Sequence, residues 1–214
     1  KTAQENDFKY LIDEFADLRI IRYTIDGWED LSLQQKEYVY HLSEAAKWGR
    51  DIYWDQNGKY NLQVRRVLED ILNKYEGDRE CPEFQDFTVY AKRVFFSNGI
   101  HHHYAEDKFF PACTKEYFKS LMEAVGDSDG CDEMLTVIYD PDFQPQRKST
   151  NSAGDIVAES AVNFYEGVTR EEVERYYAGI IDPNDETPVS YGLNTKVVKG
   201  PDGVVREEAW KSGG

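Results

Sequence analysis

Apolar residues recur every three or four positions through most of the first half of the chain. This spacing places them along one face of an α-helix. A Ser32/Gln35 pair has the spacing of a capping box, and Pro82 stands where prolines favour a helix start. We therefore predict helices whose apolar stripes face a core, over residues 8–18, 38–46, 64–75, 84–95 and 117–125.

The pattern changes in the second half. Residues 135–139 form a short β-branched and aromatic run between acidic turns, which predicts a strand. Two similar runs, residues 195–199 and 204–207, flank the turn sequence Gly200-Pro201-Asp202-Gly203 and predict a hairpin. A further helix near residues 170–177 begins with a second capping box, Thr169 with Glu172.

These elements predict an α+β fold, mainly helical over residues 1–126 and mixed over residues 127–214, with antiparallel strands and a hairpin near 195–208. Between them, residues 140–155 are rich in Pro, Ser, Asn and Gly, and this loop is where we expect disorder. No internal repeat divides the chain. Its size is that of one domain, or of one domain and part of a second.

Charge and cysteine content narrow the class of protein. The formal net charge of −16 argues against nucleic acid and anionic membranes as partners, because phosphate binding needs clustered Lys and Arg. No apolar run is long enough to predict a membrane span. Cys81, Cys113 and Cys131 fit neither a disulfide framework nor a metal motif, so we expect reduced structural thiols. Reduced thiols favour the cytoplasm; a periplasmic or exported protein is the alternative.

Three consecutive histidines, His101, His102 and His103, follow the turn dipeptide Asn98-Gly99. Both turn residues tolerate positive φ, so the preceding helix should end there and the histidines should enter a loop. In an extended segment His101 and His103 would lie on one side and could bind a transition metal. A role in a substrate cleft and a role in structural hydrogen bonding are the alternatives.

Two further polar clusters are weighed against structural explanations. Asp127, Asp129, Asp132 and Glu133 surround Gly130, but their spacing departs from a calcium-binding loop, so we interpret them as a solvated acidic loop. The polar segment 55–60 is interpreted as a structural turn between helices.

Three matches, which together cover four segments of the chain, follow a known pattern in the same order. Around the histidines an Asn-Gly turn leads through an aromatic position to a Lys-Phe-x-Pro segment, in Ser97, Asn98, Gly99, Tyr104, Lys108, Phe109 and Pro111. The other matches are the helix end at residues 42–50 and the segments 163–169 and 191–196. In these features the chain resembles dipeptidyl peptidase III, a family of zinc aminopeptidases that remove dipeptides from peptide N-termini. The triple histidine is similar to the bacterial branch.

The resemblance implies a fold and a division of labour. The family's lower lobe is a five-stranded β-barrel surrounded by helices, to which the late strands would belong. Its zinc helix carries His-Glu-x-x-Gly-His, and this sequence contains no His-Glu dipeptide. We therefore expect an N-terminal portion of a zinc-dependent dipeptidyl aminopeptidase, inactive and without zinc by itself, that packs against the rest of its own polypeptide. A non-catalytic peptide-binding domain and an unrelated helical interaction domain are the alternatives.

The resemblance also implies which residues meet substrate. Short peptides are the expected ligands, and this chain would supply one wall of their cleft. Tyr104 occupies the family's aromatic loop position and would pack on a substrate side chain. Asn98 and Gly99 would shape the loop, and His103 would donate or accept a hydrogen bond.

Overall fold

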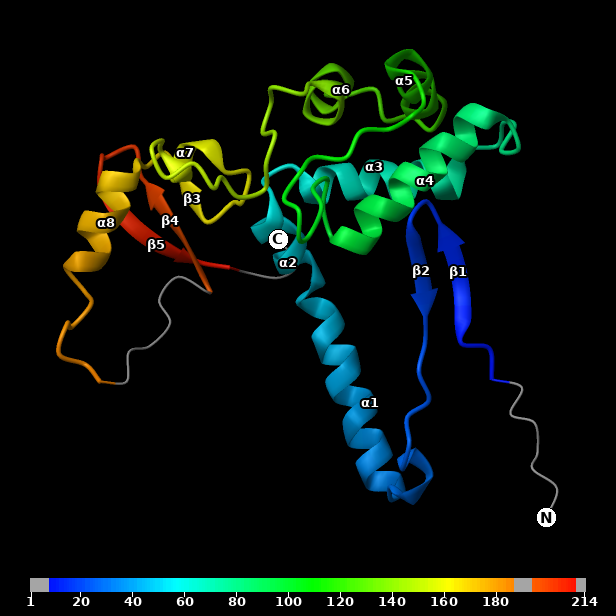
Figure 1. Ribbon diagram of the computed structural model, residues 1–214, viewed down its shortest axis with the longest axis horizontal. Coiled ribbons are helices and arrows are strands. Elements are labelled where there is room, and N and C mark those ends of the chain that lie inside the picture. Colours follow the sequence, from blue (N-terminus) through cyan, green and yellow to red (C-terminus); the bar gives the residue numbers. More distant parts are fainter. Residues whose placement is uncertain (1–7, 187–193, 211–214) are drawn as a thin grey trace. The chain divides into compact units, whose positions relative to one another are not determined.

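The chain divides into two units, Lys1–Lys47 and Trp48–Gly214, and each is described by itself. The computed structural model describes residues 8–186 and 194–210 (Figure 1). Residues 191–193 of the segment matched at 191–196 lie outside that part of the chain. The fold is α+β, as predicted.

The first unit begins with a β-hairpin where the sequence predicted a helix. Strand β1, Leu11–Phe15, pairs antiparallel with β2, Leu18–Ile21, and Phe15 lies opposite Leu18. Ala16, with φ of 49°, turns the chain between them. The prediction of a helix over residues 8–18 is wrong because a short apolar run fits both periods, and here a tight turn interrupts it.

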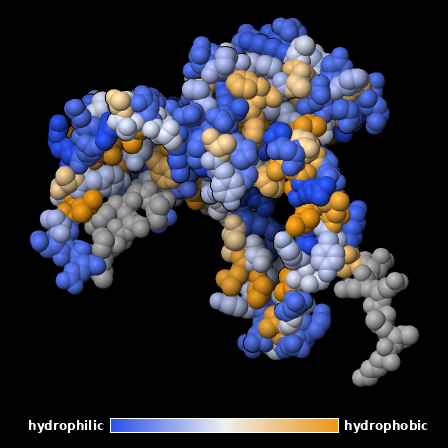
Figure 2. Space-filling model, viewed as in Figure 1, coloured by the Kyte–Doolittle hydropathy of each residue, from blue (hydrophilic) through white to orange (hydrophobic). Residues whose placement is uncertain are grey.

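Helix α1, Leu33–Trp48, follows a short 3-10 helix, Trp28–Asp30. Its capping box is confirmed: the Ser32 N–H donates to Gln35 Oε1 at 2.8 Å, and the Gln35 N–H donates to Ser32 Oγ at 3.3 Å. The predicted burial of its stripe is wrong, since Tyr38 is 64% and Leu42 is 51% exposed. Figure 2 shows hydrophobic surface along α1. Of residues 8–47 only Phe15 is buried, so this unit has almost no core of its own.

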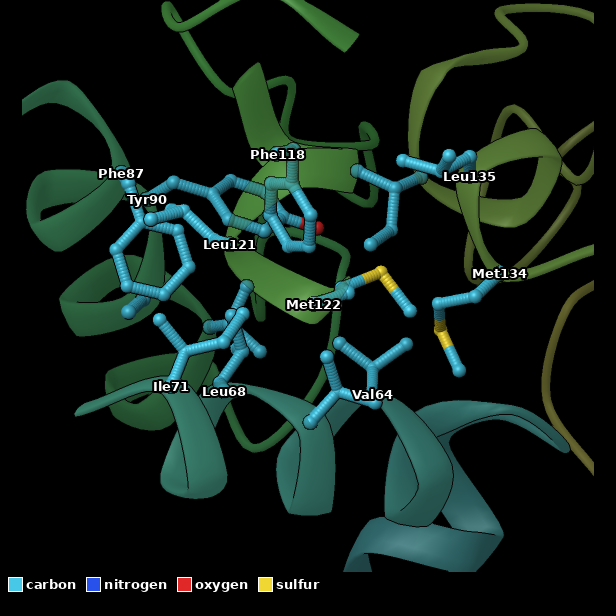
Figure 3. Close-up of a cluster of buried hydrophobic side chains, with 14 of the residues drawn as sticks. Val64, Leu68, Ile71, Phe87, Tyr90, Phe118, Leu121, Met122, Met134 and Leu135 are labelled. Carbon is cyan, nitrogen blue, oxygen red and sulfur yellow. The ribbon is translucent and has the colours of Figure 1, made fainter. Parts of the chain in front are cut away.

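The core lies in the second unit, among helices α2 to α6. Their bounds are Arg50–Asn57 for α2, Asn61–Lys74 for α3, Pro82–Ser97 for α4, Lys115–Ala124 for α5 and Cys131–Tyr139 for α6. The helices predicted from the stripes at 64–75, 84–95 and 117–125 are confirmed. Figure 3 shows side chains of α3 meeting those of α4, α5 and α6. The fully buried members include Leu68, Ile71, Phe87, Phe118, Leu121 and Leu135.

Helix α6 corrects the strand predicted at residues 135–139. The apolar pattern starts four residues earlier, and Cys131, Met134, Leu135 and Ile138 are all buried at helical spacing. Gly130, with φ of 71°, forms the N-cap. Asp132 and Glu133 in the first turn favour the helix N terminus electrostatically. A β-branched run therefore becomes helical because the residues before it start a helix.

The C-terminal part of this unit contains helices α7, Ile156–Glu159, and α8, Arg170–Ala178, and strands β3, Tyr165–Glu166, β4, Thr195–Lys199, and β5, Val205–Ala209. The predicted hairpin β4–β5 and the capping box of α8 are confirmed. The sheet order is β3-β4-β5, and β3 pairs parallel with β4, which was not predicted. Residues 8–186 and 194–210 form no closed barrel.

Two expectations from the sequence concern the state of the cysteines and the absence of a membrane span. Cys81, Cys113 and Cys131 are free thiols. In the residues that the structure describes, no helix has both the length and the apolar character needed to cross a membrane.

Candidate functional site: the histidine loop

Helix α4 ends at the Asn98-Gly99 turn, as predicted. Asn98 adopts the left-handed conformation, with φ of 53° and ψ of 43°, and the Gly99 N–H donates to Val94 O at 3.1 Å. A Cβ on Gly99 would lie 2.4 Å from Asn61 Nδ2, and Asn61 is only 1% exposed. The turn therefore needs glycine because the backbone passes directly over a buried side chain.

Residues 100–109, here called the histidine loop, fold back on themselves. The Phe109 N–H donates to Ile100 O at 2.8 Å, and the His102 N–H donates to Asp107 O at 2.7 Å. His101 and Lys108 face each other as an isolated antiparallel bridge. The loop is thus a short ladder whose tip is residues 103–106.

His101 points into the protein and is 2% exposed. Its Nε2 donates to Gln144 O at 2.8 Å, and in the described part of the chain its Nδ1 has no hydrogen-bond partner. The pKa of His101 is lowered to about 4, mainly by burial and also by the nearby Lys108 and Arg147 cations, although the hydrogen bond to Gln144 opposes this effect. His101 is therefore a neutral structural histidine, one of the alternatives considered from the sequence.

Lys108 anchors the inner strand of the ladder. Its ammonium group donates to Asp140 O and Phe143 O, both at 2.7 Å. Asp140 is the C-cap of α6, so the cation also lies at the negative end of that helix. Burial lowers the pKa of Lys108 to about 8, although the Asp140 carboxylate opposes this effect.

Arg147 clamps the tip of the loop from outside. Its guanidinium forms a two-pronged pair with Glu106, with Nε–Oε2 at 2.9 Å and Nη2–Oε1 at 2.8 Å. It also donates to His103 O and to Asn57 Oδ1, both at 3.1 Å. Asn57 in turn donates to Asn98 O at 3.2 Å. One arginine therefore joins the loop tip, the end of α2 and, through Asn57, the end of α4.

These contacts correct the disorder predicted for residues 140–155. Gln144 accepts from His101, Phe143 accepts from Lys108, and Arg147 pairs with Glu106. The segment's turn-rich composition reflects an irregular path that buried polar groups fix in place. The turn predicted at 55–60 is confirmed only for residues 58–60, because residues 55–57 are the last residues of α2, and Asn57 contacts Arg147 from there.

The other face of the loop is aromatic. His102 and His103 stack with ring centroids 4.9 Å apart, and Phe96 meets His103 edge-on at 5.3 Å. His103 Nδ1 lies 3.2 Å from Ser97 Oγ. The structure thus pairs His103 with His102 and not with His101, which corrects the expected side-by-side arrangement of His101 and His103.

Tyr104 is the most exposed large residue of the loop, with 83% of its surface in water. Asn98 is partly buried and Gly99 is buried at the end of α4. His103 is partly exposed, and its ring centroid lies 4.4 Å from that of Tyr104. Sequence reasoning missed Arg147, Glu106 and Asn57. No local signal marks them, because Arg147 is 41 residues from Glu106 and 90 from Asn57.

The described residues contain no cluster of side chains suited to hold a metal ion. Residues 8–186 and 194–210 contain no group of three or more His, Cys, Asp or Glu that could hold a metal ion. In the acidic loop Asp132 pairs with Lys119 at 2.9 Å and Gly130 caps α6. Asp127 departs from the predicted solvated loop: its Oδ2 is buried, and burial raises its pKa.

No family model fits the chain, and no curated protein matches it significantly. The functional interpretation therefore depends on the residues and on the geometry described above.

Proposed function

We propose that the chain is the N-terminal portion of a zinc-dependent dipeptidyl aminopeptidase similar to dipeptidyl peptidase III, and that the histidine loop forms part of the wall of its substrate cleft. The observation that carries this proposal is Tyr104, 83% exposed on a loop held from behind by buried polar contacts. Exposed aromatics on fixed loops are typical of ligand contacts, since core packing does not explain them.

The anchoring supports binding energetically. Lys108 fixes one strand of the loop and Arg147 fixes its tip, so little conformational entropy remains to be lost when a peptide binds. Tyrosine offers a large contact area with few rotatable bonds. The net charge of −16 would attract peptides through their cationic N-terminal ammonium group.

Zinc and catalysis are assigned to the rest of the proposed enzyme. The residues of this chain do not fit the family's zinc site, because the sequence has no His-Glu dipeptide. We expect the purified chain to be metal-free after dialysis and inactive on dipeptidyl arylamides. One tightly bound zinc per chain would contradict the assignment. Location in the cytoplasm is proposed with it, or in the periplasm after signal removal.

Peptide titration of the isotope-labelled chain tests the binding role. A short peptide with a free N-terminus and apolar side chains should shift the amide signals of Phe96 and of residues 102–105. Tyr104→Ala should abolish these shifts without changing the thermal midpoint. Tyr23→Ala is the matched control, because Tyr23 is also exposed, at 75%, and lies outside the loop. Equal peptide response in both variants would contradict the proposal.

A non-catalytic interaction domain is the second candidate, and the exposed stripe of α1 favours it. Leu33, Tyr38 and Leu42 are between 51% and 73% exposed, which indicates a surface that another polypeptide segment covers. In the enzyme this would be the rest of the same polypeptide. The downstream reading frame discriminates, since an enzyme must carry His-Glu-x-x-Gly-His there.

A further inference from the structure

His102 makes two contacts that the proposed substrate site does not explain. The backbone N–H groups of Tyr104 and Ala105 both donate to His102 Nδ1, at 3.1 and 3.0 Å. We propose that His102 is the positioning residue of the histidine loop: its neutral imidazole holds the backbone of Tyr104 and thereby sets where that side chain is presented. The consequence for peptides rests on the proposed function, whereas the positioning itself does not.

The geometry fixes the chemical form of the imidazole. An Nδ1 atom that accepts hydrogen bonds carries no proton, so the neutral ring is protonated on Nε2. In this form His102 is a hydrogen-bond donor at Nε2 and not a metal ligand, because a ligating nitrogen must offer its lone pair.

The same hydrogen bonds require the neutral ring. A cationic imidazole has an N–H at both nitrogens, so it would turn a donor toward the Tyr104 and Ala105 amides and could no longer accept from them.

Several charged groups surround His102. His103 stacks on the ring, and its own pKa is lowered by burial first and by the His102 and Arg147 charges after that. Backbone hydrogen bonds join Glu106 and Asp107 to His102. Arg93 lies over Phe109, whose ring centroid is 5.8 Å from that of His102. Glu106 is already paired with Arg147, so it offers less attraction to a second cation.

Nuclear magnetic resonance on the complete 214-residue chain tests the proposal. At about pH 8, long-range nitrogen-proton spectra should show His102 protonated on Nε2, and the Tyr104 and Ala105 amides should exchange roughly fivefold more slowly than solvated amides, which corresponds to about 1 kcal/mol for each hydrogen bond. At the acidic pH at which the same spectra show protons on both His102 nitrogens, that protection should disappear. Protection factors, not raw rates, are compared, because intrinsic amide exchange itself depends on pH.

Two variants separate the acceptor from the ring. In His102→Asn, Oδ1 can accept from the N–H groups two and three residues ahead, as in an Asx turn, so protection should persist at both pH values. In His102→Leu the acceptor is absent and protection should be lost at both pH values. Equal protection in wild type and His102→Leu, or a proton on Nδ1 at pH 8, would overturn the proposal. If His102→Leu fails to fold, the wild-type tautomer and its pH series decide.

Failure of this inference can be distinguished from failure of the proposed function. Peptide-induced shifts in a chain whose His102 is protonated on Nδ1 would refute the positioning role alone. The expected tautomer and protection without any peptide response would refute the peptide site and leave the positioning role standing.

Discussion

The buried His101 predicts a specific loss of stability in acid. Its ordinary pKa is 6.5, and burial lowers the pKa in the folded chain to about 4. As pH falls below 6.5, His101 binds a proton in the unfolded chain but stays neutral in the folded chain. The contribution to the free energy of unfolding is therefore fully present above pH 6.5 and is lost as pH falls toward 4.

The magnitude follows from the same two values. At about 1.4 kcal/mol per pH unit, the interval from 6.5 to about 4 corresponds to about 3 kcal/mol, an appreciable part of the stability of a typical domain. His101 is 2% exposed, so solvent screening reduces this figure little. Carboxylates that are ion-paired in the folded state also lose stability in acid, and the experiment must separate the two effects.

His101→Gln provides that separation. The glutamine amide can still donate to Gln144 O, but it does not titrate. Urea denaturation at about pH 7 and pH 4.5 should give a loss of stability about 2 to 3 kcal/mol larger in wild type than in the variant. Equal losses in both proteins would refute the assignment of a buried neutral histidine, because the shared carboxylate contribution cancels in the comparison.

Three further predictions concern the scaffold of the loop. Gly99→Ala should destabilise the chain by about 1 to 3 kcal/mol, because the new Cβ would clash with Asn61. Gly126→Ala should destabilise it less, because φ of Gly126 is also positive but a Cβ there would meet no atom within 4 Å. Similar thermal midpoints for the two variants would contradict the close approach at Gly99. Arg147→Met should lower the free energy of unfolding by about 2 kcal/mol, because the Glu106 side chain is only 19% exposed and would lose its partner. Amide hydrogen exchange should become faster at residues 103–106. Unchanged exchange at these residues would exclude the clamp. The pKa of Lys108 is lowered from 10.5 to about 8, so between these pH values the unfolded chain binds more protons than the folded chain. The free energy of unfolding of wild type should therefore rise relative to that of Lys108→Met as pH increases from about 8 to 10. Parallel pH profiles of the two proteins would count against a buried ammonium.

The sequence predicted elements well where they were long and strongly periodic. Helices α3, α4 and α5 each bury a stripe over several turns, and only one period fits such a stripe. Residues 8–18 and 135–139 were assigned wrongly because short apolar runs fit both periods. There the turn at Ala16 and the helix start at Gly130 decided between them.

In the candidate site, too, the sequence predicted the locally determined features but not those that depend on distant contacts. Local chemistry alone determined the end of α4 at Asn98-Gly99, the entry of the histidines into a loop and the two capping boxes, because each depends on residues within about four positions of one another. Only the tertiary structure decided that His101 is buried, that His102 and His103 stack, and that Arg147 clamps Glu106. Those outcomes depend on segments up to 90 residues apart in the sequence that pack around one core. Which side chains are buried, and which hydrogen bonds they form there, is settled only when these segments pack together.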